Sequence, residues 1–132
     1  LKLAVLSEKT KKEIESLYPG MEAVNPIDLI ADARADRYSV VLDLVLSDPN
    51  VNGVMVINML KSCFFEPEDS LAIPKVARMH ADKPVVDVAA GGEDFALVYK
   101  VLQSTSIPVY NLPEKAARAL RALRIYHRIT VQ

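Results

Sequence analysis

The most regular hydrophobic pattern in the chain is an apolar run followed by a glycine turn and an amphipathic segment. Residues 85–95 read Val-Val-Asp-Val-Ala-Ala-Gly-Gly-Glu-Asp-Phe. The apolar, mostly β-branched run predicts a strand that is buried on both faces, and the two glycines allow a sharp turn. The acidic pair that follows suits the positive end of a helix. This stretch therefore predicts a strand, a turn and a helix, as in one half of a βαβ unit.

The same alternation recurs along the rest of the chain. Four further apolar runs predict strands, at 3–6, 24–30, 54–57 and 107–110. Amphipathic or proline-initiated segments follow them, and Ser7 is placed to cap the first predicted helix. The run at 54–57 is wholly apolar and is predicted to be the central strand, whereas Pro74 is predicted to kink or restart a helix. Five alternations of strand and helix predict a three-layer α/β/α parallel sheet, for which a flavodoxin-like topology is the simplest.

Length and composition narrow the class of protein. The 132 residues fit one domain, spanning 1–132, and the net charge of -1 offers no electrostatic case for nucleic acid. A single cysteine, Cys63, excludes an internal disulfide and a multi-cysteine metal cage. No apolar run approaches the roughly 20 residues of a membrane helix, and no signal peptide is visible. We therefore expect a cytoplasmic chain without membrane contact, and its first residue, Leu1, suggests a fragment of a longer multidomain chain.

Two turns are candidate binding elements. Gly91 and Gly92 open a predicted helix, where backbone N–H groups can bind an anion. A strand-to-helix turn without a ligand is the alternative, and it is favoured because no nucleotide-binding fingerprint is present. Asn25 and Asp28 either fix loop geometry through side-chain to backbone bonds or face a partner domain.

The residues with reactive side chains do not form a recognisable catalytic set. Cys63 lies in the long loop after the run at 54–57, whereas His80 and His127 fall late in predicted helices. A catalytic Cys–His pair is therefore not expected, and no metal site is predicted. Asp87 interrupts an apolar strand, which places it either in a functional role or on an edge strand.

The last predicted helix carries a basic stripe. Its members are Lys115, Arg118, Arg121, Arg124 and Arg128. Spaced by three or four residues, they favour a solvated face, with contact to an acidic partner or neighbouring domain as the alternative.

Several short motifs, taken in order, resemble a known family. They are Asn-Pro-Ile-Asp-Leu at 25–29, Asp-Arg-Tyr at 36–38, Lys-Pro-Val-Val at 83–86, Gly-Gly-Glu at 91–93, Ile-Pro-Val-Tyr at 107–110 and Pro-Glu-Lys-Ala-Ala-Arg-Ala-Leu at 113–120. From Leu1 to about Leu123 the chain resembles the succinyl-CoA synthetase-like CoA-ligase domain of NDP-forming acyl-CoA synthetases.

The resemblance implies a role inside a larger enzyme. Such enzymes interconvert an acid, CoA and NTP with acyl-CoA, NDP and phosphate through a phosphohistidine on another domain. CoA, ATP and Mg are implied for the whole enzyme and none for this domain. The implied partners are CoA-binding, phosphohistidine and ATP-grasp domains or subunits. In that setting the domain is structural and supports the active site, and alone it is expected to be inactive.

The chain also departs from the family pattern. Family members usually have a first βα unit, which would carry the phosphate-facing helix, and we expect this chain to lack it before Leu1; neither histidine matches the phosphohistidine motif. We therefore assign no catalytic residue, and we expect Gly91, Gly92, Asn25 and Asp28 on an inter-domain or anion-facing turn. The alternative function is an acyl-CoA-sensing regulatory or binding module attached to another catalytic domain.

Overall fold

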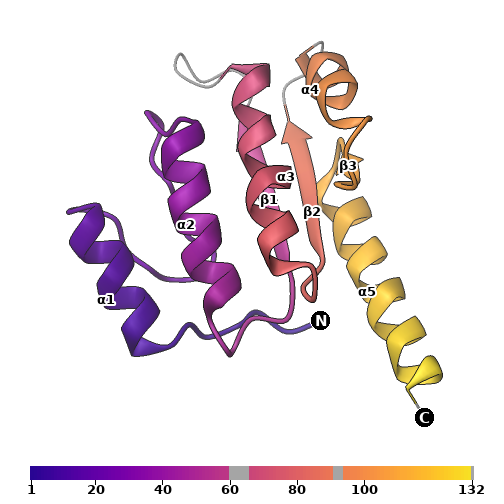
Figure 1. Ribbon diagram of the computed structural model, residues 1–132, viewed down its shortest axis with the longest axis horizontal. Coiled ribbons are helices and arrows are strands. Elements are labelled where there is room, and N and C mark those ends of the chain that lie inside the picture. Colours follow the sequence, from indigo (N-terminus) through magenta and orange to yellow (C-terminus); the bar gives the residue numbers. More distant parts are fainter. Residues whose placement is uncertain (60–65, 91–93, 132) are drawn as a thin grey trace.

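In the part of the chain that the structure describes, three parallel strands form one sheet (Figure 1). The computed structural model describes residues 1–59, 66–90 and 94–131, and in that part of the chain the strands are β1 (Val54–Met59), β2 (Val85–Ala90) and β3 (Val109–Tyr110). They lie in the order β1-β2-β3, with Val54 opposite Val85 and Met59 opposite Ala90. β3 is much shorter and pairs only with Asp87 and Val88. β2 is thus the strand with a neighbour on each side.

Helices cover both faces of this sheet. The described helices are α1 (Glu8–Leu17), α2 (Ala35–Ser47), α3 (Ala72–Ala77), α4 (Asp94–Leu102) and α5 (Pro113–Thr130), with 3-10 turns at Pro67–Leu71 and Arg78–His80. Pro74 lies in α3, whose six residues are flanked by those two turns, so the segment is broken as predicted for an interior proline. Ser7 caps α1 through a bond from the Thr10 N–H to its hydroxyl, also as predicted.

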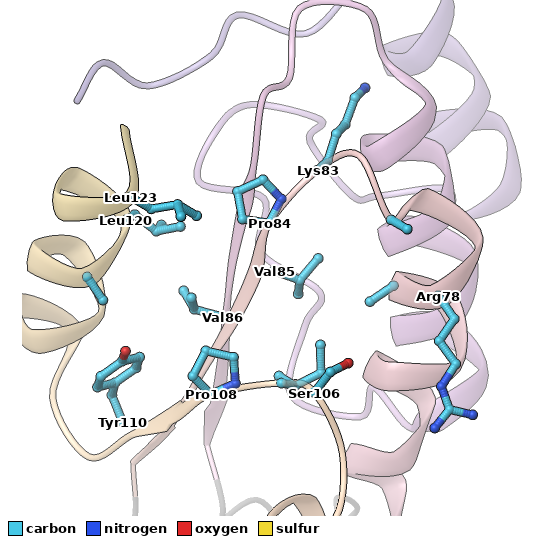
Figure 2. Close-up of a pocket in the computed structure, with 14 residues that line it drawn as sticks. Arg78, Lys83, Pro84, Val85, Val86, Ser106, Pro108, Tyr110, Leu120 and Leu123 are labelled. Atoms are coloured by element: carbon cyan, nitrogen blue, oxygen red, sulfur yellow. The ribbon is translucent and has the colours of Figure 1, made fainter. Parts of the chain in front are cut away.

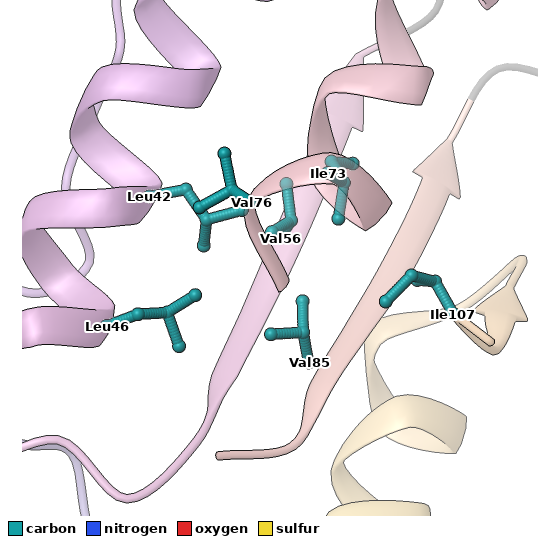
Figure 3. Packing of buried hydrophobic residues seen from close by; sticks show 7 residues of the cluster. All are labelled: Leu42, Leu46, Val56, Ile73, Val76, Val85 and Ile107. Atoms are coloured by element: carbon teal, nitrogen blue, oxygen red, sulfur yellow. The ribbon is translucent and has the colours of Figure 1, made fainter. Parts of the chain in front are cut away.

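The larger part of the core lies between the sheet and the α2–α3 layer. Figure 3 shows side chains from both helices converging on the strands. The buried members are Leu42 and Leu46 of α2, Ile73 and Val76 of α3, Val56 of β1, Val85 of β2, and Ile107. Each aliphatic side chain that is fully buried contributes about 2 kcal/mol to folding.

A smaller cluster lies on the opposite face. There Val86 and Val88 of β2 pack against Ala116 of α5, and Met55 and Leu120 border them. Because residues of alternate parity on β2 are buried by different helix layers, the strand is buried on both faces. The three-layer α/β/α arrangement predicted from the apolar runs is therefore confirmed.

Two of the five predicted strands are wrong. Neither 3–6 nor 24–30 forms a strand in the structure, although both segments pack against α1 and help to bury it. Each has an apolar pattern that suits a strand, but a strand also needs a hydrogen-bonding neighbour. The prediction that 54–57 is the central strand is also wrong. Since neither of those segments pairs with it as a strand, β1 is an edge of the described sheet, and β2 is central.

A buried carboxylate connects the start of the chain to the turn between α2 and β1. Asp48 is 1% exposed and accepts bonds from the backbone N–H of Ser7 and of Asn50, each at 2.8 Å. Burial alone would raise the pKa of Asp48, but bonds from Thr10, Asn50 and Ser7 together lower it to about 2. The ammonium of Lys83 binds the carbonyls of Leu46 and Asp48, at 2.6 and 2.9 Å, and so caps the end of α2.

Asp48→Asn is expected to lower the free energy of unfolding at pH 7 by about 2 kcal/mol, because an amide nitrogen cannot accept these bonds. The pKa of Asp48 is about 2 in the folded protein, against 3.8 ordinarily. Its contribution is therefore complete above about pH 4 and is lost as the pH falls through 2. Urea unfolding followed by circular dichroism at pH 7 and pH 2.5 measures the effect. Asp82→Asn, at an exposed position, is the control, and an Asp48→Asn deficit of equal size at both pH values would contradict the assignment.

Candidate functional site

Ligands of parallel α/β sheets bind beyond the carboxyl ends of the strands. β1 and β2 end side by side at Met59 and Ala90. Gly91 and Gly92 follow β2 directly but lie outside the described residues. The turn that they are predicted to form therefore stays a prediction. The structure does describe the ends of β1 and β2 next to it.

A pair of buried polar side chains lies under this edge. Asn58 of β1 and Asp87 of β2 both have no exposed surface, and Asn58 Nδ2 donates to Asp87 Oδ1 at 2.6 Å. The second oxygen of each group, Asn58 Oδ1 and Asp87 Oδ2, has no hydrogen-bond partner in the described part of the chain. Burial raises the pKa of Asp87 to about 7, against a small lowering by the Val88 backbone N–H.

Two further polar groups lie close to the strand ends. Burial, and then the negative charge of Asp87, raise the pKa of the Tyr38 phenol to about 12. Ser70, in the 3-10 turn Pro67–Leu71, is fully buried, and its hydroxyl has no partner among the described residues. Sequence reasoning flagged Asp87 but missed Asn58. The signal that could have identified Asn58 is that the apolar runs at 54–59 and 85–90 each contain one polar residue.

Asn25 and Asp28 fix the geometry of the loop before α2. Asn25 Nδ2 donates to the carbonyl of Ala4 at 3.0 Å, and Asp28 Oδ1 accepts from the N–H of Ile30 at 2.8 Å. These are the side-chain to backbone bonds anticipated for the pair. Their place on an inter-domain or anion-facing turn stays a prediction.

The same loop contains a strained residue. Ile30 has φ of 65°, in the left-handed region that β-branched side chains rarely adopt. The bond from Ile30 N–H to Asp28 and the bond from Ala33 N–H to the Ile30 carbonyl hold this conformation from both sides.

A groove runs along the free edge of β1. Its volume is about 590 Å³, and the loop from Pro26 to Ala33 and one side of α2 form the walls that face β1. Ile57 and Met59 of β1 line it and are 48% and 66% exposed. We call this the β1-edge groove. Because an edge strand presents unpaired N–H and C=O groups, the groove combines backbone donors and acceptors with apolar walls.

A second groove, of about 530 Å³, lies between α3, α5 and the start of β2 (Figure 2). Its floor is apolar, with Val85, Val86 and Leu120 among the lining residues. Figure 2 shows the charged ends of Arg78 and Lys83 directed away from its centre. The groove therefore lacks the converging polar groups that a polar substrate requires, and it lies at the amino end of β2.

The remaining candidates do not come together as a catalytic set. His80 Nε2 contacts Asp43 Oδ1 at 2.7 Å, which ties α2 to the Arg78–His80 turn. His127 is exposed on α5, and Cys63 lies outside the described residues. The basic stripe is exposed along α5, as predicted. In the described ranges we find neither a group of acidic, histidine or cysteine side chains suited to a metal ion nor a helix able to cross a membrane.

These features define a class of protein: a parallel three-layer α/β domain of the flavodoxin-like type. A crystal structure of a Pyrococcus horikoshii OT3 protein matches 86% of the chain, with a TM-score of 0.78 and 31% identity. The apo acetyl-coenzyme A synthetase 1 of Ca. Korarchaeum cryptofilum matches 93%, with a TM-score of 0.79; at 24% identity it supports the fold alone. The chain covers 27% and 28% of those two chains.

Sequence comparison places the chain beside ADP-forming CoA ligases. No established protein-family profile matches it. The alpha subunit of acetate–CoA ligase [ADP-forming] II of Pyrococcus furiosus is 36% identical over 127 residues, which is 93% of this chain and 28% of the relative. Acetate–CoA ligase [ADP-forming] I of Archaeoglobus fulgidus is 28% identical, over 98% of the chain and 18% of the relative.

A third relative extends the range of acids. The 4-hydroxybutyrate–CoA ligase [ADP-forming] of Nitrosopumilus maritimus is 27% identical, over 93% of the chain and 18% of the relative. The chain spans less than a third of each of these relatives. The resemblance to NDP-forming acyl-CoA synthetases is thus confirmed: the chain is a homologue of one part of these enzymes.

Ile30→Gly is expected to raise the free energy of unfolding by about 1 kcal/mol, because glycine adopts a positive φ without the clash that isoleucine has. Val24→Gly is a matched control, since Val24 is also β-branched and exposed in this loop, and its φ is not positive. That variant should lose about 0.5–1 kcal/mol through unfolded-state entropy. Chemical denaturation of both variants tests the assignment, which fails if Ile30→Gly is destabilised as much as Val24→Gly.

Proposed function

We propose that the chain serves as a non-catalytic domain of an NDP-forming acyl-CoA synthetase. The observation that carries this proposal is the 36% identity with the Pyrococcus furiosus ligase subunit over 93% of the chain. In this role the complete enzyme makes acyl-CoA from an acid, CoA and NTP, and the present domain supports the active site structurally. CoA, ATP and Mg bind elsewhere in the complete enzyme.

The described side chains support a structural role. His80 is engaged by Asp43, and His127 is exposed near the end of α5. The basic groups near the core, Arg37 and Lys83, bind backbone carbonyls or a surface carboxylate. Phosphoryl transfer needs a nucleophile and a positively charged phosphate site. On this proposal both are supplied by other domains.

The β1-edge groove supports the expectation that a further βα unit completes the sheet. β1 offers a six-residue edge, and the groove beside it has apolar walls contributed by Ile27, Val41 and Val45. A strand added here would pair with β1 on its free side and cover Ile57 and Met59. We propose that this strand comes from another part of the synthetase.

The free end of α5 is the second proposed contact surface. Figure 1 shows the yellow end of α5 running past the sheet towards the C-terminus. Ile125, Tyr126 and Ile129 are 48%, 65% and 70% exposed there, at a spacing that forms one stripe. Arginines flank this stripe, so a neighbouring domain with an acidic rim around an apolar centre would fit it.

The proposed function is tested by two enzyme assays. The isolated chain should form no thioester from acetate, CoA and ATP, and turnover by the chain alone would refute a non-catalytic role. A chimera in which this chain replaces the aligned 127-residue segment of the Pyrococcus furiosus subunit, combined with the rest of that enzyme, should form acetyl-CoA. The subunit lacking the segment is the control and should be inactive.

Met59→Lys is expected to leave the isolated chain folded but to lower the activity of this chimera by at least tenfold, because it places a charge in the β1-edge groove. Met79→Lys is the matched control, since Met79 is also 66% exposed and does not line the groove. It should change neither stability nor activity. Equal activities for the two variants would argue against a partner strand in the groove.

A further inference from the structure

The buried pair Asn58–Asp87 poses a hydrogen-bonding problem that one proton solves. With Asp87 ionised, its Oδ2 and Asn58 Oδ1 are both acceptors, and neither has a partner in the described part of the chain. A buried acceptor without a donor destabilises the folded state, and a buried charge without a counter-ion does so more strongly. Among the described residues, no salt bridge reaches Asp87.

A neutral carboxyl group removes both difficulties. A carboxylic acid and a primary amide are complementary, because each offers one donor and one acceptor on neighbouring atoms. The N–H of Asn58 already binds one oxygen of Asp87 at 2.6 Å. A proton on the other oxygen can then be donated to Asn58 Oδ1, which closes a two-bond ring between β1 and β2.

We propose that the folded protein holds Asp87 as a neutral acid that donates its proton to Asn58, so that the two side chains form a pH-sensitive latch between β1 and β2. The latch lies one residue before the end of β1 and three before the end of β2. It acts beyond the proposed structural role, because it makes the strand ends under the candidate site respond to pH. It does not depend on the identity of the enzyme to which the chain belongs.

The surroundings described for Asp87 favour the protonated form. Tyr38 approaches from α2, and its own pKa is raised, so it remains uncharged. Asp69, in the 3-10 turn Pro67–Leu71, adds negative charge near Tyr38, and the described cation that pairs with it is Arg34 at 3.8 Å. The described ionisable side chains are Lys75 on α3 and Tyr99 and Lys100 on α4, and all three are exposed. β3 contributes Val109 opposite Asp87 and Tyr110 on the opposite face of the sheet.

The sign of the effect follows from the two pKa values. The pKa of Asp87 is about 7 in the folded protein and 3.8 ordinarily. The latch therefore contributes fully below about pH 4 and is lost as the pH rises through 7. Across that window the folding equilibrium constant falls by up to about tenfold per pH unit.

The test compares the wild-type chain with Asp87→Asn, which keeps the shape and donates an amide N–H to Asn58 at every pH. Urea unfolding from pH 4.5 to 8.5 gives the ratio of the two folding constants. The wild type should lose at least 100-fold relative to Asp87→Asn over this range, with the loss levelling off above pH 7. Asp82→Asn, at an exposed position, should show no such trend. A ratio that is flat, or that rises with pH, would overturn the latch.

A second measurement covers the case in which Asp87→Asn does not fold. In the wild-type chain, the carbon-13 shift of the Asp87 carboxyl group should titrate near pH 7. The side-chain amide protons of Asn58 should move with the same midpoint, because they share the hydrogen-bonded ring. A carboxyl midpoint near pH 4, or Asn58 protons that do not respond, would overturn the proposal.

Discussion

The fold depends on the burial of one strand, β2, on both of its faces. Its residues of one parity pack under α2 and α3, and those of the other parity pack against α5. β1 is in register with β2 over six residues but has helix cover mainly on one face, and β3 pairs with β2 over only two. A parallel ladder must be shielded from water by helices on both sides. Only β2 meets that condition fully, which makes it the axis from which the other elements are placed.

The sequence predicted β2 and its burial on both faces well, because an apolar, β-branched run has few alternatives, but it assigned the central position to 54–57. The proline-initiated helices and the helical spacing of α2 and α5 also agreed with the structure. The runs at 3–6 and 24–30 were misassigned because hydrophobic periodicity reports burial and says nothing of a hydrogen-bonding neighbour. The pairing of Asn58 with Asp87 depends on a contact between distant segments. The positive φ of Ile30 is held by bonds within its own loop, and no glycine marks the position in the sequence. For Gly91 and Gly92 the sequence remains the source of the prediction.

Two buried aspartates show how surroundings decide the chemistry of one residue type. Asp48 accepts bonds from two backbone N–H groups and from Thr10, and these donors outweigh burial, so its pKa falls to about 2. Within the described residues Asp87 has one side-chain donor, Asn58, and burial dominates, so its pKa rises to about 7. The first carboxyl group stabilises the fold as an anion and the second as a neutral acid. As the pH rises from about 4 to 7, Asp87 loses the neutral form that stabilises the fold, whereas Asp48 stays ionised and keeps its stabilising bonds.

The open edge of β1 also affects how the chain can pair with other segments when the proposed partner strand is absent. A six-residue parallel edge bordered by the exposed side chains of Ile57 and Met59 can pair with any extended segment that reaches it. Covered edges are the usual protection against such pairing, and no charged residue of β1 blunts this one. Without the proposed partner strand, this edge would remain available for pairing with other extended segments. Folding as part of a larger chain, with that strand tethered close by, would shield the edge at high effective concentration.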